Sequence, residues 1–138
     1  MPFGSAFALN ADGTGLTTLY DFGGGYELGR VTVLGNTLYG TTPYPVGTTP
    51  GGRPENGTIY SLSFSPQLTI IPSAANVILT WPTNYAGFDY TGYTLQSIRN
   101  LGSPSAWVTN SPPPVVIAGQ NTVTNPITGA QKFYRLIQ

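Results

Sequence analysis

Residues 57–63 read GTIYSLS, and residues 4–10 read GSAFALN. Both stretches contain, in the same order, a glycine, a small residue, an aromatic residue and a leucine. The matching aromatic residues and leucines are Phe7, Leu9, Tyr60 and Leu62. A strand start that recurs in this way is typical of repeat architectures, in which a single unit cannot bury its own apolar faces. The sequence therefore predicts an incomplete repeat that needs a further surface to pack against.

The repeat pattern predicts a first module at residues 1–65. Its last segment, residues 57–64, is expected to be an orphan strand that begins a second repeat. Such a strand suits addition to the open sheet edge of a neighbour, and copies joined head to tail without closure grow into a fibre. The residues expected to mediate this assembly are Phe7, Leu9, Tyr60, Leu62 and Phe64.

The composition indicates an all-β protein with little charge. The chain has 138 residues, among them 18 glycines and 13 prolines, and only 7% are charged, with a net charge of zero. Frequent turn formers between short apolar stretches favour many strands, and no helical periodicity is present. A neutral chain offers no basic surface to nucleic acid or to an anionic membrane. We expect neither a nucleic-acid partner nor a membrane span.

The chain contains no cysteine and no histidine. Disulfides, thiol nucleophiles, Ser-His-Asp triads, the common zinc sites and imidazole proton shuttles are thereby excluded. Asp21 and Glu27 could approach each other across the triple glycine at residues 23–25, as a glycosidase pair would require. Solvated loop acids are the alternative for these two residues. We expect no enzyme, no catalytic residue, no metal and no cofactor.

Two tight turns are expected in the first module. Asp12-Gly13 lies between strand-like residues 4–10 and 16–22, and Gly35-Asn36 lies between residues 30–34 and 37–41. Such dipeptides favour hairpins because both central residues tolerate positive φ. Residues 10–14 (NADGT) faintly resemble a calcium loop, but the acids that such a loop needs do not follow, so a hairpin turn explains them better. Residues 42–56 read as a long surface loop.

The second half, residues 66–138, predicts a small β-sandwich of about seven strands. In residues 76–81 (NVILTW), Val77, Leu79 and Trp81 alternate with Ile78 and Thr80, which is the pattern of a strand with one buried face. Burial of Trp81 is therefore expected. Arg135 lies in strand phase between Phe133 and Ile137, where it would snorkel or pair with Asp89.

Two resemblances follow from longer stretches. The first half resembles the GloVer-type tandem repeat of bacterial secreted and surface proteins, and the second half resembles a fibronectin type III-like or immunoglobulin-like module. For the first, the matching segments are GSAFALNADGTGLTTLYDF (4–22), VTVLGNTLYGTT (31–42) and NGTIYSL (56–62). For the second, they are VILTWP (77–82), GYTLQSIRNLGSPSAW (92–107), NTVTNP (121–126) and QKFYRL (131–136).

These resemblances imply a propeller-like unit followed by a β-sandwich, and an extracellular or cell-surface location. They carry no catalytic residues. The start of the sequence, Met1-Pro2-Phe3, has no signal-peptide pattern. The leading expectation is a self-assembling structural protein whose partners are copies of itself.

The alternative expectation is a carbohydrate-binding or adhesive accessory module of a larger secreted protein. Its glycan contacts would be Trp107, which lies beside proline and serine, and Tyr44 in the proline-rich loop. Aromatic side chains stack on sugar rings, but they also pack in cores and interfaces. Both interpretations stay open for these two residues.

Overall fold

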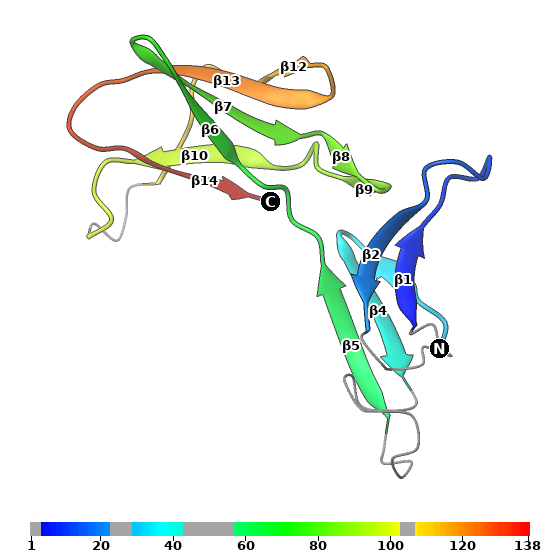
Figure 1. Ribbon diagram of the computed structural model, residues 1–138. Helices are drawn as coiled ribbons and strands as arrows, with labels where there is room; N and C mark the ends of the chain where they lie inside the picture. The colour runs from blue at the N-terminus through cyan, green and yellow to red at the C-terminus, as the bar shows by residue number, and fades with distance from the viewer. Residues whose placement is uncertain (1–3, 23–28, 43–56, 103–106) are drawn as a thin grey trace. The chain divides into compact units, whose positions relative to one another are not determined.

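A computed structural model describes residues 4–22, 29–42, 57–102 and 107–138 (Figure 1). Every regular element in these ranges is a β-strand, so the predicted all-β class is confirmed. The chain divides into two compact units, Met1–Phe64 with Ala86–Phe88, and Ser65–Tyr85 with Asp89–Gln138. The predicted surface loop at 42–56, apart from Thr42, lies outside the described residues, as do the triple glycine, Glu27 and Tyr44.

The N-terminal unit contains two antiparallel sheets. Its strands are β1 (Ser5–Ala8), β2 (Thr17–Asp21), β3 (Thr32–Leu34), β4 (Thr37–Thr42) and β5 (Thr58–Ser63). One sheet is the ribbon β1-β2, and the other has the order β3-β4-β5. Propeller blades are four-stranded sheets, and the described part of this unit forms none. The propeller-like arrangement therefore stays a prediction.

Both predicted hairpin turns are present. Gly13 adopts a φ of +83° between β1 and β2, and its N–H donates to the carbonyl of Asn10 over 2.9 Å. Gly35 adopts a φ of +56° between β3 and β4. Glycine accepts these left-handed values without the strain that a Cβ would add. The two sequence predictions of hairpins are thus confirmed.

The expectation of an orphan strand at residues 57–64 needs correction. Strand β5 pairs antiparallel with β4 along its whole length, from Thr37 opposite Ser63 to Thr42 opposite Thr58. The hydroxyls of Thr37 and Ser63 are also 3.0 Å apart. The strand that looks like the start of a second repeat therefore completes the sheet of the first one.

Tyr60 and Phe22 form the aromatic centre of this unit. Tyr60 lies directly opposite Gly40 on the neighbouring strand, and its ring occupies the space where a Cβ of residue 40 would stand. The Tyr60 ring meets Phe22 edge to face at 4.9 Å between centroids, and Phe22 is only 1% exposed. The glycine in the TLYGTT segment thus admits a ring that links β4 and β5 to the end of β2.

The two copies of the repeated pattern face different environments. Phe7 and Leu9 are 59% and 51% exposed, whereas their counterparts Tyr60 and Leu62 are half-buried. On β1 the buried residue is Ala6, next to Phe7. Matching sequence positions therefore differ in exposure, because the alternation of a strand does not specify which of its two faces is covered.

The C-terminal unit contains two larger antiparallel sheets. Their orders are β12-β13-β7-β6 and β11-β10-β14. The strands are β6 (Thr69–Ser73), β7 (Asn76–Pro82), β10 (Thr94–Ile98), β11 (Val108–Thr109), β12 (Val115–Ile117), β13 (Gln120–Pro126) and β14 (Phe133–Ile137). Two further short strands, β8 (Asn84–Tyr85) and β9 (Phe88–Asp89), pair through a turn at Ala86-Gly87 with positive φ at both residues. The sequence analysis missed this hairpin.

The core of this unit lies between its two sheets. Leu79 and Trp81 on β7 and Val123 on β13 pack with Leu95 on β10. Leu68, Val77, Tyr134 and Leu136 pack around this cluster and are partly buried. Trp81 is 0% exposed, which confirms the expected alternation of β7. Full burial of such side chains contributes about 1.5–3 kcal/mol each, and these residues hold the two sheets together.

The Gly40–Tyr60 contact leads to a stability prediction. In Gly40→Ala the new Cβ would collide with the Tyr60 ring. The ring cannot move away without losing its edge-to-face contact with Phe22. We expect the free energy of unfolding to fall by about 1–3 kcal/mol, as for other overpacked sites. Chemical denaturation followed by tyrosine fluorescence measures it.

Gly92→Ala is the matched control, because no atom lies within 4 Å of a Cβ built there. A double-mutant cycle with Tyr60→Ala adds a second check, since removal of the ring should relieve most of the collision. A Gly40→Ala protein as stable as the wild type would contradict the arrangement.

Candidate functional site

Strand β14 lies at the edge of its sheet and contains Arg135, whose side chain contacts an amide and an indole ring. It pairs with β10 over five positions, from Thr94 opposite Ile137 to Ile98 opposite Phe133. Its other edge has no strand partner among the described residues. An edge strand presents a row of backbone N–H and C=O groups that another strand can pair with.

Arg135, Gln96 and Trp107 form a stack on one face of the β11-β10-β14 sheet. Arg135 lies directly opposite Gln96, and its Nε and Nη2 donate to Gln96 Oε1 over 3.0 and 2.9 Å. The guanidinium carbon is 4.3 Å from the centre of the Trp107 ring. Planar guanidinium groups favour this position because the face of an indole ring carries partial negative charge. The expected pairing of Arg135 with Asp89 is therefore wrong.

The stack bears on the glycan expectation for Trp107. Trp107 is half-buried, and the guanidinium covers one face of its ring. An aromatic ring beside a guanidinium and an amide is a combination that can bind hydroxyl or carboxylate groups. A sugar that stacks on the covered face must displace Arg135. Tyr44, the other residue expected to contact glycans, lies outside the described residues.

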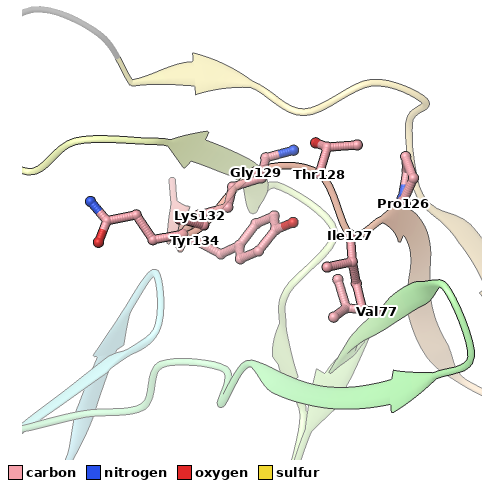
Figure 2. Close-up of a pocket in the computed structure, with 9 residues that line it drawn as sticks. Val77, Pro126, Ile127, Thr128, Gly129, Lys132 and Tyr134 are labelled. Carbon is pink, nitrogen blue, oxygen red and sulfur yellow. The ribbon is translucent and has the colours of Figure 1, made fainter.

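A shallow hollow of about 170 Å³ adjoins the start of β14 (Figure 2). Its walls include Val77, Ile127 and Tyr134, whose side chains face one another in Figure 2. Lys132 lies at its rim, with Nζ 5.3 Å from the centre of the Tyr134 ring. Because Val77 and Tyr134 also pack against the core, the hollow lies at the margin of the core. Its lining is mainly apolar.

Two of the three acids that the structure describes, Asp12 and Asp89, serve local turns, and the third, Asp21, lies in β2. Asp12 Oδ1 accepts hydrogen bonds from the backbone N–H and the hydroxyl of Thr14, over 2.9 and 2.7 Å. Asp89 accepts the equivalent pair from Thr91, over 2.8 and 2.9 Å. The Thr14 hydroxyl and N–H lower the pKa of Asp12, and the Thr91 N–H and hydroxyl lower the pKa of Asp89. Both carboxylates are thus held ionised as turn acceptors.

Metal ligands and membrane helices are not found in the described ranges. No group of three or more acidic, histidine or cysteine residues there could hold a metal ion. No helix in the same ranges is long and apolar enough to cross a membrane. Residues 10–14, which faintly resemble a calcium loop, form a turn in which Thr14 donates two hydrogen bonds to Asp12.

The expected assembly residues do not form one surface. Phe7 and Leu9 are exposed, whereas Tyr60, Leu62 and Phe64 are half-buried. Their role in assembly stays a prediction. Sequence reasoning did not find the Gln96–Arg135 pair, which depends on the register of β10 with β14. It also did not find the hollow at Tyr134, which depends on the approach of Val77 to residues 126–134. The alternation of residues 131–137 was the only available signal.

The turn acids yield a prediction about pH. A lowered pKa in the folded state stabilises the fold above the ordinary aspartate value, and this contribution is lost as the pH falls through the lowered pKa. In Thr14→Val the largest cause of the shift disappears, so the Asp12 pKa should rise toward its ordinary value. Carboxyl carbon shifts followed by NMR during acid titration measure this. Asp89 is the internal control, and an unchanged Asp12 pKa would contradict the assigned cause.

Comparison with known proteins gives no relative: no protein-family model, no curated protein and no solved structure matches this chain significantly. The GloVer-type and fibronectin-like resemblances therefore stay predictions. The function has to be argued from the chain's own surfaces.

Proposed function

We propose that this protein is a non-enzymatic, extracellular structural subunit that associates with copies of itself through open β-sheet edges. The edges themselves carry the proposal. All three residues of β12, Val115, Val116 and Ile117, are exposed, and all are apolar. Long-lived monomers commonly protect such edges with lysine, a bulge or a covering segment.

Two other edge strands have the same character. Strand β6 borders the four-stranded sheet with Ile70 and Ile71 exposed, and β3 borders its sheet with Val33 and Leu34 exposed. None of these strands contains a charged residue. Pro72 in β6 removes one backbone donor, which is the one protective feature within these three strands. Apolar edges of this kind favour burial against another chain.

The low charge of the chain supports the same proposal. Only 7% of residues are charged and the net charge is zero, so little electrostatic repulsion opposes association. Apolar contacts of this kind should tolerate salt, since screening acts on charges and leaves hydrophobic burial in place.

Sedimentation velocity of the purified chain over a wide concentration range tests the proposal. We expect the sedimentation coefficient to rise with concentration at both low and high salt, and electron microscopy to show regular assemblies. A single monomeric species under all these conditions would rule out the structural role.

A carbohydrate-binding or adhesive module is the second candidate, and the Trp107–Arg135–Gln96 stack favours it. The stack offers an aromatic ring, a cation and an amide on one sheet face. Acidic sugars would suit this group best, because a carboxylate can draw the guanidinium off the ring and expose the indole.

Glycan-array binding tests this second candidate. Trp107→Ala should abolish binding, and Trp107→Phe should retain part of it because a ring remains. Leu101→Ala, which changes an exposed apolar side chain in a turn, serves as the control. Equal binding by the Trp107→Ala and wild-type proteins would remove this candidate.

A further inference from the structure

We propose that the open edge of β14 receives strand β1 of a second copy, so that copies join head to tail. This inference rests on the proposed function and names one pair of strands through which copies would associate. Four observations support the acceptor edge, the donor strand and their pairing.

The strand order of the C-terminal unit leaves a place beside β14. In immunoglobulin-type sandwiches, strands A, B, E and D form one sheet and strands C, F and G form the other. In the order of the sheet, β6, β7, β13 and β12 take the positions of A, B, E and D. Strands β10 and β14 take those of C and F. Strand β14 therefore lies at the edge of its sheet, and no described strand pairs with its other side (Figure 1).

Two side chains of β14 that pack against the core are only partly covered. Tyr134 and Leu136 of β14 pack against the core but are only half-buried, whereas Leu95 on the neighbouring strand is 2% exposed. The hollow lined by Tyr134, Val77 and Ile127 adjoins the start of β14 (Figure 2). A strand added here, with apolar side chains at alternate positions, would cover both residues and fill the hollow. In strand addition, backbone pairing gives affinity and such pockets give specificity.

Strand β1 has the side chains that this edge requires. Phe7 and Leu9 are both exposed and stand two residues apart, which is the spacing of Tyr134 and Leu136. Ala8, which lies between them, and Ala6, which precedes Phe7, are small. Strand β1 belongs to a two-stranded ribbon, so one of its edges has no strand partner within the described residues. It can therefore pair on that side without leaving β2.

The charges of the two units are complementary. Residues 1–64 carry a net charge of −2, and residues 65–138 carry +2. The acids of the first range are Asp12, Asp21, Glu27 and Glu55, and its cations are Arg30 and Arg53. The second range has Asp89 against Arg99, Lys132 and Arg135, and two of these cations lie on or beside β14. This asymmetry favours contact between unlike units and disfavours contact between like ones.

Donor and acceptor are different surfaces, so the contact is heterologous. Each copy then offers a free β14 edge on one unit and a free β1 edge on the other. Such a contact builds an open filament unless its rotation closes into a ring.

The absence of cysteine from the chain permits a direct test. Two single variants, Ala8→Cys and Ile137→Cys, are prepared separately, mixed, and exposed to mild oxidation. We expect a disulfide-linked heterodimer on non-reducing gels and by mass spectrometry, with few homodimers. Leu101→Cys, an exposed position in a turn, replaces Ile137→Cys in the control mixture. Homodimers in excess, or equal cross-linking in the control mixture, would overturn the proposed contact.

A second measurement uses side chains whose loss does not disturb a core. Phe7→Ser with Leu9→Ser should weaken association roughly tenfold or more, because two apolar contacts are lost. Ile59→Ser removes an apolar side chain from β5 that is even more exposed, and it should leave association unchanged. If the wild-type chain is monomeric, the proposed function itself fails. If the chain assembles but ignores the Phe7 and Leu9 changes, only the β1–β14 contact is wrong.

Discussion

The burial of Trp81 and Leu79 between two sheets is the interaction on which the C-terminal unit depends. Both residues lie on β7, the inner strand that pairs with β6 and β13. Through Leu95 they join the opposite sheet. The indole N–H of Trp81 has no hydrogen-bond partner among the described residues, so packing alone holds this ring. The chain has no cysteine and therefore no disulfide, and this apolar contact joins the two sheets of the unit.

A buried amide pair adds specificity to that packing. Asn125 Nδ2 donates to Asn110 Oδ1 over 2.7 Å, and Asn110 Nδ2 donates in return over 3.3 Å. The backbone N–H of Asn110 also donates to the carbonyl of Leu95. Since buried amides are costly when unpaired, this reciprocal arrangement disfavours slipped registers of β13 and β10. Among the described residues, polar side chains thus fix strands and turns through their hydrogen bonds.

The N-terminal unit is also held together by a small apolar cluster. Tyr60 over Gly40, with Phe22 against it, supplies a compact aromatic centre, while Phe7 and Leu9 stay exposed on the ribbon. A small unit buries a smaller fraction of its surface than a large one, so more apolar surface remains for contacts between chains. In the N-terminal unit, Phe7 and Leu9 stay exposed, and in the C-terminal unit, Tyr134 and Leu136 are only partly buried. Both observations follow from the small size of the sheets.

The sequence by itself determined the all-β class, the hairpins at Asp12-Gly13 and Gly35-Asn36, and the burial of Trp81. Each depends on neighbours within a few residues, through turn chemistry or alternation. Tertiary structure alone decided that β5 completes the sheet of β4, that Phe7 and Tyr60 face different environments, and that Arg135 stacks on Trp107. It also decided that β14 keeps an open edge. These features depend on which distant strands pair and which face they cover, and a period of two along one strand is the same for either choice.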